Sequence, residues 1–197
     1  MNNFWDERFG HEEYAYGIKP NQYFKQELEK LTPGKILLPA EGEGRNAVFA
    51  AKLGWQVTAF DSSFEGKKKA EKLAKKNSVS INYILNNYEE FKTNLGEFDC
   101  VALIFAHMQP NKRNEYHKKI TALLEPAGTL ILEGFSKKQI NNNTGGPKNI
   151  DMLFSSNELQ NDFESFSKLN INETETTLDE GQSHQGVTSV IRVLGIK

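Results

Sequence analysis

The residues best suited to chemistry lie between positions 41 and 61. Glu41, Gly42, Glu43 and Gly44 form an acidic glycine turn, and Asp61 follows 17 residues after Gly44. Glycines take positive φ without strain and let a ligand approach the backbone closely. A carboxylate at the end of the next strand can accept hydrogen bonds from both hydroxyls of a ribose. The spacing therefore predicts a nucleotide site, with Asp61 at the sugar.

The segments around these residues predict the elements that position them. Ile36–Leu38 is a short apolar run, typical of a strand that is buried on both faces. Asn46–Leu53 has helical spacing with a face of small residues, and Gly54 ends that helix. Trp55–Phe60 alternates as a second strand. Together these elements make up one half of a nucleotide-binding α/β fold.

The charges of the turn bear on which nucleotide it binds. Residues 42–47 fit the pattern G-x-G-x-x-A, so the pattern alone allows a dinucleotide such as NAD. Glu41 and Glu43 would place two carboxylates beside the pyrophosphate, and such contacts cost on the order of a few kcal/mol at an effective dielectric of about 20. S-Adenosylmethionine carries a sulfonium and an ammonium instead, which acidic neighbours suit. The residues thus favour the methyl donor.

The chain resembles class I S-adenosylmethionine-dependent methyltransferases in three motifs, E-G-E-G-R-N-A, F-D-S-S and F-D-C-V. Within that superfamily it is similar to small bacterial enzymes of the tellurite-resistance and thiopurine-methyltransferase type. That similarity includes F-W-D-E-R-F and Y-G-I-K-P-N near the start and E-G-Q-S-H-Q-G near the end. The resemblance implies a seven-stranded Rossmann-like α/β sandwich with strand order 3-2-1-4-5-7-6 and an antiparallel last strand. Where most members have an acid and then a glycine, this chain has Leu38 and Ala40, so we assign Glu41 to the methionine end of the cofactor.

The resemblance also implies which residues hold the cofactor. In the family the N-terminal segment forms a lid, which would bring Tyr16 and Gly17 near the methionine carboxylate. The residue after the third strand meets the adenine edge, a role that falls on Asn87 with Tyr88 beside the ring. The predicted cofactor-binding residues are Tyr16, Gly17, Ala40, Glu41, Gly42, Gly44, Arg45, Asn46, Asp61, Ser62, Ser63, Asn87, Tyr88, Phe105, Ala106 and His107.

Ordinary structural roles compete with some of these assignments. The aromatic residues of the N-terminal segment would also suit a terminal helix packed on the edge of the sheet. Ser62 or Ser63 could cap a helix that begins at Phe64. Asn86 and Asn87 could form a simple turn.

The end of the chain predicts an antiparallel hairpin, with strands over Ser167–Leu178 and Val187–Ile196. Such a hairpin is typical of the methyltransferase sheet and absent from the dinucleotide fold, so it is a second argument against NAD. Ser136–Asn149 is polar and predicts a mobile loop that gates the substrate. The remaining predictions are helices over Asn21–Leu31, Phe64–Lys76 and Lys112–Leu124, a short helix capped by Ser155 or Ser156, and strands over Val79–Leu85, Phe98–Phe105 and Thr129–Leu132.

Two histidines are candidates for a general base. His184 lies in a glycine-bounded turn four residues after Glu180, and His107 follows a predicted central strand at a switch point of the sheet. An exposed turn residue and a structural hydrogen bond are the respective alternatives. We predict that Tyr16, His107 and His184 border one cavity, which the acceptor enters between residues 5–17 and 180–186.

Composition limits the class of protein. The net charge is -2 and 25% of the residues are charged, so the chain is not a polycation. We therefore expect neither nucleic acid nor a membrane as a partner. Glu65 and Glu71 are interspersed with the lysines of residues 67–76, as on a solvated helix face. Cys100 is the only cysteine, no apolar run of about 18 residues exists and residues 1–10 lack the apolar core of a signal peptide, so we expect a cytoplasmic location. The sequence shows no metal-binding or Walker-type motif.

The expected protein is therefore a single methyltransferase domain over residues 1–197, as a monomer or homodimer. Residues 1–31 would form the N-terminal lid and helices, residues 35–135 the cofactor-binding core, and residues 136–197 the substrate-side loop and terminal hairpin. The acceptor would be a small molecule such as a thiol, a thiopurine or a chalcogen oxyanion. The alternatives are a non-catalytic module that binds S-adenosylmethionine or S-adenosylhomocysteine, and an NAD-binding oxidoreductase.

Overall fold

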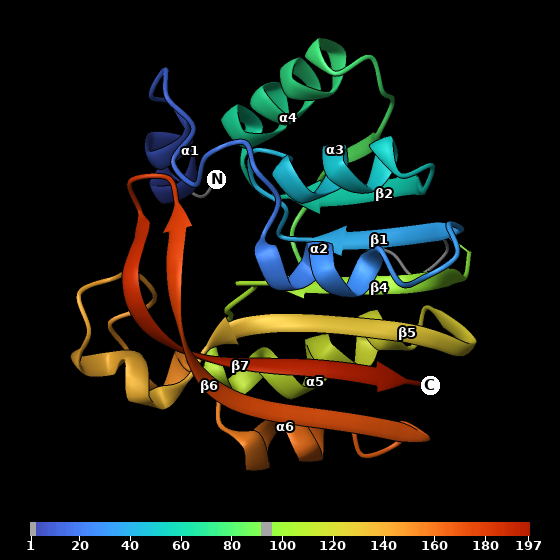
Figure 1. Ribbon diagram of the computed structural model, residues 1–197, viewed down its shortest axis with the longest axis vertical. Coiled ribbons are helices and arrows are strands. Elements are labelled where there is room, and N and C mark those ends of the chain that lie inside the picture. Colours follow the sequence, from blue (N-terminus) through green and yellow to red (C-terminus); the bar gives the residue numbers. More distant parts are fainter. Residues whose placement is uncertain (1–2, 92–95) are drawn as a thin grey trace.

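A computed structural model describes residues 3–91 and 96–197 (Figure 1). Its centre is a seven-stranded sheet with order β3-β2-β1-β4-β5-β7-β6, as the sequence predicted. The first five strands run parallel to one another, and β7 is antiparallel to both β5 and β6. The strands are β1 (Lys35–Pro39), β2 (Gln56–Asp61), β3 (Asn82–Leu85), β4 (Phe98–Ile104), β5 (Leu124–Phe135), β6 (Lys168–Glu180) and β7 (His184–Ile196).

Helices cover both faces of this sheet (Figure 1). On one face, small and apolar residues of α2, α3 and α4 pack against β1 and β2, with Phe24, Ala47 and Ala70 in one buried cluster. On the other face, Ile120 of α5 and Phe163 of α6 join the second cluster. The helices are α1 (Asn3–Phe9), α2 (Gln22–Leu28), α3 (Arg45–Lys52), α4 (Phe64–Lys76), α5 (Pro110–Thr121) and α6 (Ser156–Asp162), with short 3₁₀ helices η1 (Lys137–Asn141) and η2 (Ile150–Met152).

Local capping explains where several helices begin. Ser63 caps α4 by accepting a hydrogen bond from the backbone N–H of Gly66. Ser155 and Glu158 form a reciprocal capping box at α6. Both caps were predicted from the sequence, because serine before a helical pattern satisfies N–H groups that have no partner within the helix.

Several predicted segments have other bounds in the structure; the strand predicted over Thr129–Leu132, for example, spans Leu124–Phe135. The third strand begins only at Asn82, because Ser78 takes a positive φ of 57° in the turn after α4. The helix predicted over Lys112–Leu124 begins at Pro110 and ends at Thr121, and Leu124 already pairs with Phe98 in the sheet. Residues 136–149, predicted as a loop, contain η1, whose side chains are partly buried.

The terminal hairpin is long and reaches the N-terminal segment. β6 and β7 pair over 13 residues each, from Lys168↔Ile196 to Glu180↔His184. Their turn lies beside α1 at the upper left of Figure 1. The backbone N–H of Ser183 donates to the carbonyl of Ala15 at 3.2 Å. The hairpin therefore carries its tip to the carboxyl ends of the parallel strands.

Gly44, just before α3, lies in close contact with Ala70 of α4. It has a φ of 85°, and a Cβ there would lie 2.5 Å from the Cβ of Ala70. Gly96 has a similar φ of 87° but no atom within 4 Å of such a Cβ. Gly44→Ala should lower the free energy of unfolding by roughly 1–3 kcal/mol more than Gly96→Ala, because overpacking adds to the shared backbone cost. Urea denaturation measures both losses, and equal losses would contradict this account.

Candidate active site

The glycine turn follows β1 and leads into α3. Ala40, Gly42 and Gly44 all have positive φ, at 52°, 60° and 85°. The turn is needed because the chain must leave the buried strand and enter a helix within five residues. Alanine in this region is strained, and backbone strain in a non-glycine residue is commonly found at functional sites.

The two glutamates of the turn point into the protein. Oε1 of Glu41 accepts hydrogen bonds from the backbone N–H groups of Asn46 and Ala47, both at 2.8 Å, and so caps α3. Burial raises the pKa of Glu41 to about 7, against the opposing effect of these hydrogen bonds. Glu43 pairs with Lys69 of α4 at 2.8 Å. Both carboxylates are therefore engaged within the protein, and they would repel a pyrophosphate less than the free carboxylates that the sequence suggested. Contact of Glu41 with the methionine end of the cofactor stays a prediction.

Asp61 ends β2 beside this turn. Its Oδ2 accepts from the backbone N–H of Gly42 at 3.0 Å, and its Oδ1 accepts from that of Ser63 at 2.9 Å. Burial raises the pKa of Asp61, while the backbone hydrogen bonds lower it. Each carboxylate oxygen has further lone pairs, so Asp61 keeps the capacity to accept ribose hydroxyls.

The N-terminal segment closes over these strand ends. Asp6 of α1 accepts from the Ser63 hydroxyl at 2.6 Å and from the backbone N–H of Glu65 at 3.2 Å. The ring of Phe9 lies against Gly42 and is 2% exposed. Ser63 thus serves α4 and α1, whereas its predicted contact with the cofactor stays untested. These contacts are those expected of a lid.

The residues after β3 and β4 lie at the same edge of the sheet, where the parallel strands end. Asn87 accepts hydrogen bonds from the backbone N–H groups of Glu89 and Glu90, so it does shape a turn. Tyr88 stacks on Tyr116, and its hydroxyl is buried without a hydrogen-bond partner in the described part of the chain. Phe105 follows β4 with a positive φ of 52°, and Ala106 is buried beside it.

A buried polar network joins the site to the hairpin. The Asn21 side chain donates to Glu133 at 2.6 Å and to Glu180 at 2.9 Å. Arg45 pairs with Glu180 at 2.8 Å, and Arg192 pairs with Glu133 at 2.5 Å. Sequence reasoning missed the parts played by Asn21, Glu133 and Arg192. One signal was available, because Glu133 is a charged residue at the end of an otherwise apolar strand.

His184 lies at the centre of this region. Its Nδ1 is 3.5 Å from Oε2 of Glu180, and the side chain is 6% exposed. Its ring lies 4.5 Å from that of Tyr16, 4.6 Å from that of Phe105 and 5.1 Å from that of Phe135. His184 is therefore buried among aromatic rings and is not the exposed turn residue of the alternative.

His107 has a different environment. Its Nδ1 donates to the carbonyl of Met152 at 2.8 Å, and its Nε2 accepts from the backbone N–H of Phe135 at 3.0 Å. Burial lowers the pKa of His107 to about 4. Both ring nitrogens are engaged, as in the structural alternative. The ring of Phe135 separates His107 from His184, whereas Tyr16 and His184 are in direct contact.

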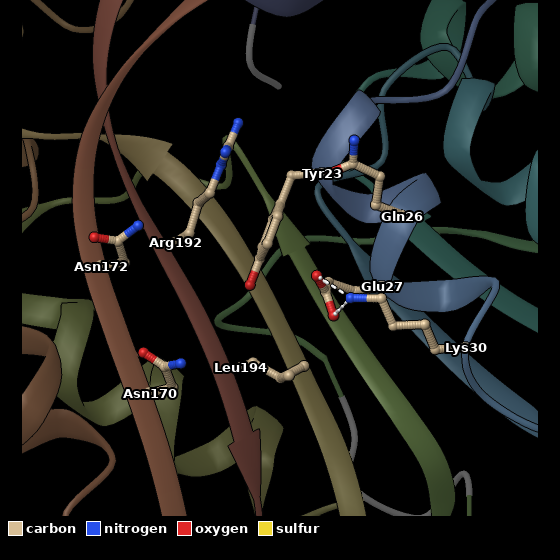
Figure 2. Close-up of a pocket in the computed structure, with 8 residues that line it drawn as sticks. All are labelled: Tyr23, Gln26, Glu27, Lys30, Asn170, Asn172, Arg192 and Leu194. Carbon is tan, nitrogen blue, oxygen red and sulfur yellow. Dashed lines mark hydrogen bonds and ion pairs between the residues drawn. The ribbon is translucent and has the colours of Figure 1, made fainter.

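Two surface hollows lie near this network. The first, of about 360 Å³, lies between α2 and the strands β6 and β7 (Figure 2), and on its wall the guanidinium of Arg192 lies 5.0 Å from the centre of the Tyr23 ring. Arg192 connects this hollow to the network through its ion pair with Glu133. The second, of about 590 Å³, lies between residues 8–15 and the hairpin turn at residues 182–183.

Comparisons with known proteins bear on this geometry. Residues 36–128 match the family described as a methyltransferase domain. No curated protein sequence matches the chain. Among solved structures, TehB from Haemophilus influenzae is similar with a TM-score of 0.70 at 17% identity, over 90% of this chain and 62% of TehB. The chain thus spans less than two thirds of TehB.

Two further structures are similar in fold. A protein described for the conversion of a disulfide bond into a thioacetal group during echinomycin biosynthesis has a TM-score of 0.74 at 16% identity, over 100% of this chain and 91% of that one. The plantazolicin methyltransferase BpumL, in complex with S-adenosylhomocysteine and a desmethyl analogue, has a TM-score of 0.65 at 14% identity, over 90% and 86%.

The sheet order and the antiparallel hairpin are those of the class I methyltransferase fold, and residues 36–128 match the methyltransferase-domain family. The NAD-binding alternative is set aside, since the dinucleotide fold has no such hairpin.

Asp61 is the sharpest test of the cofactor site. Asp61→Asn should weaken binding of S-adenosylhomocysteine at least tenfold, because charge-assisted hydrogen bonds contribute roughly 1.5–3 kcal/mol each. Asp99→Asn is a matched control, since Asp99 also accepts a backbone N–H, that of Lys35, but at the opposite end of the sheet. Titration calorimetry gives both affinities. Unchanged affinity in the Asp61 variant would remove Asp61 from the ribose.

Proposed function

We propose that this chain methylates a small-molecule acceptor with a sulfur or other chalcogen nucleophile, and that His184 is the general base. The observation that carries the proposal is the position of His184. It is oriented by Glu180 and buried among aromatic rings, and its Nε2 has no hydrogen-bond partner among the described residues.

The strand-end residues fit the methyl donor. Asp61 offers acceptor oxygens for a ribose, and the unpartnered hydroxyl of Tyr88 offers a donor beside the adenine position. We assign the predicted cofactor residues of the glycine turn and of residues 105–106 to the same ligand. When bound, S-adenosylmethionine would supply an electrophilic methyl group for an in-line displacement, in which the acceptor gains the methyl group and S-adenosylhomocysteine leaves. A thiol acceptor must also lose its proton, whereas an oxyanion such as selenite has none to lose.

Removal of the thiol proton is the step that this chain's own residues would carry out. Burial lowers the pKa of His184 below its ordinary value, and Glu180 opposes this only in part, so the imidazole is neutral at physiological pH. Burial raises the pKa of Glu180, but the hydrogen bonds and charges of His184 and Arg45 outweigh it and bring that pKa to about 2. Glu180 is therefore ionised and favours a proton on Nδ1, which leaves the lone pair on Nε2 for the acceptor.

The surrounding segments exclude water from this base. Tyr16 covers one side of the His184 ring, and Phe105 and Phe135 cover others. A closed apolar surround protects an activated methyl group from hydrolysis and orients the acceptor. Support for a sulfur acceptor comes at the level of fold from the similar protein that forms a thioacetal.

Nothing in the described residues indicates a membrane-spanning role. In residues 3–91 and 96–197, the helices are too short or too polar to cross a bilayer. We propose a single domain, with α1 and residues 10–17 as its lid and η1 with the hairpin tip on the acceptor side.

A transfer assay tests the proposed function. Labelled S-adenosylmethionine and a panel of thiols, thiopurines, selenite, tellurite and small amines should give labelled product with at least one sulfur or chalcogen acceptor. Binding of S-adenosylhomocysteine, measured by calorimetry, is the control. Tight binding without transfer to any acceptor would favour the non-catalytic module instead.

His184→Gln tests the base. It should lower kcat at least tenfold while it leaves the affinity for S-adenosylhomocysteine within about twofold, because general bases typically contribute 10²–10⁴ to rate. In the parent protein, kcat should fall as the pH drops through the lowered pKa of His184, below its ordinary value of 6.5. Glu180→Gln should move this fall to still lower pH, because the carboxylate raises the pKa of His184. A parent profile that is flat down to pH 4 would contradict the role of His184.

A further inference from the structure

The hollow between residues 8–15 and the hairpin turn holds an arginine without an acid. The other three arginines each pair with a carboxylate, Arg45 with Glu180, Arg113 with Asp162 and Arg192 with Glu133. Arg8 has no carboxylate within 4.0 Å among residues 3–91 and 96–197. Its guanidinium is half-buried and lines the hollow. A cation held at a concave surface without a counter-charge is suited to an anionic ligand.

Neighbouring groups hold Arg8 in place without neutralising it. Its Nη1 donates to the hydroxyl of Tyr16 at 2.8 Å. Its guanidinium lies 4.8 Å from the centre of the Phe4 ring and 5.6 Å from that of Trp5. These contacts fix the orientation of the side chain by hydrogen bonding and cation–π attraction. They leave the positive charge and the remaining N–H donors for a ligand.

The same hollow carries negative charge on its wall. Glu12 and Glu13 line it with Gln182, and Gln182 donates to the carboxylate of Glu13 at 2.7 Å. Within the part of the chain that the structure describes, neither glutamate side chain forms an ion pair. The hollow thus presents the Arg8 cation and two carboxylates that do not pair with one another, and the imidazole of His11 also lines it. An anion alone would satisfy Arg8 and be repelled by the acids, whereas a zwitterion suits both signs.

The hollow lies one side chain away from the proposed base. Tyr16 touches Arg8 through its hydroxyl and His184 through its ring, at 2.8 Å and 4.5 Å. A bare oxyanion held at Arg8 would therefore lie a tyrosine length from His184. Because Tyr16 lies between the hollow and His184, an acceptor with its charged end in the hollow brings its nucleophile to His184 when the Tyr16 ring moves aside. The volume of about 590 Å³ is in the range of small-molecule sites.

We propose that this hollow binds the charged end of a zwitterionic, amino-acid-type thiol, with its carboxylate at Arg8 and its ammonium at Glu12 and Glu13. The inference rests on the proposed function, because it names the substrate class of the same site. The thiol sulfur then faces His184, which takes the thiol proton on Nε2.

Four thiols of matched length test this inference. L-Homocysteine carries both charges, 4-mercaptobutyrate only the carboxylate, 3-mercaptopropylamine only the ammonium, and 1-propanethiol neither. We expect KM to be lowest for L-homocysteine, by about tenfold against each singly charged thiol, since 1.4 kcal/mol corresponds to tenfold. Calorimetric binding of each thiol to the protein saturated with S-adenosylhomocysteine gives a readout independent of turnover.

Variants assign each charge. Arg8→Gln should raise KM about tenfold for the two carboxylate thiols and leave the other two within about twofold, and Arg8→Lys should restore part of the loss. Glu12→Gln combined with Glu13→Gln should raise KM for the two ammonium thiols. Lys19→Gln is the control, because Lys19 is exposed on the same segment and does not line the hollow. The affinity for S-adenosylhomocysteine reports that each variant is folded.

The outcomes separate this inference from the function on which it rests. Equal KM values for the four thiols, equal effects of the variants on all four, or no binding of any to the complex would each overturn the zwitterion site. If selenite or a neutral thiopurine is methylated under the same conditions, the methyltransferase function stands while the inference falls. If S-adenosylhomocysteine itself does not bind, the proposed function fails.

Discussion

The candidate site depends on the contacts that the buried carboxylate of Glu180 makes. A buried charge costs several kcal/mol unless it is paired and hydrogen-bonded. The Glu180 carboxylate accepts a hydrogen bond from Asn21, pairs with Arg45 and lies beside His184 of its own hairpin. Asn21 and Arg45 are both far from Glu180 in the sequence. The start of α2, the start of α3 and the hairpin tip are thereby held to one point. Loss of any partner would leave the charge undercompensated, so the three segments are positioned together.

The sheet explains why that point lies where it does. Parallel strands bring their carboxyl ends to one edge, and the switch in strand order next to β1 opens a crevice there. Two buried clusters on opposite faces of the sheet hold the strands in place, and this fixes the positions of the turn residues at the strand ends. The hairpin adds what parallel strands cannot, an element that approaches this edge from the acceptor side. Chemistry on loops over a rigid sheet is the expected division of labour in α/β proteins.

The sequence predicted the topology but not the side-chain partners. The glycine turn, the acid after β2 and the terminal hairpin carry local signals, and the strand order was implied by the family resemblance that such motifs support. Glu43 was predicted to face the ligand, yet it pairs with Lys69, 26 residues away. Asn21 and Glu133 meet across 112 residues. Such partners depend on how close the elements pack, and neither spacing nor residue type carries that information in a single sequence. His184 could be singled out from the sequence, because its glycine-bounded turn and the nearby Glu180 are local signals.

The place of β7 has a consequence for how the protein is made. β7 follows β6 in the chain but lies between β5 and β6, so β6 has no neighbour until β7 has been synthesised. The hairpin of β6 and β7 is local, but the pairing of β7 with β5 joins residues far apart in the chain, such as Phe135 and Val190. Non-local pairings form late, because chain entropy is lost before the contacts compensate for it. β7 begins at His184 and supplies Arg192. On the ribosome, the emerging chain can thus form β1 to β5 first and remain without the proposed base until the last strand inserts. The order of strands therefore places the completion of the candidate site at the end of folding.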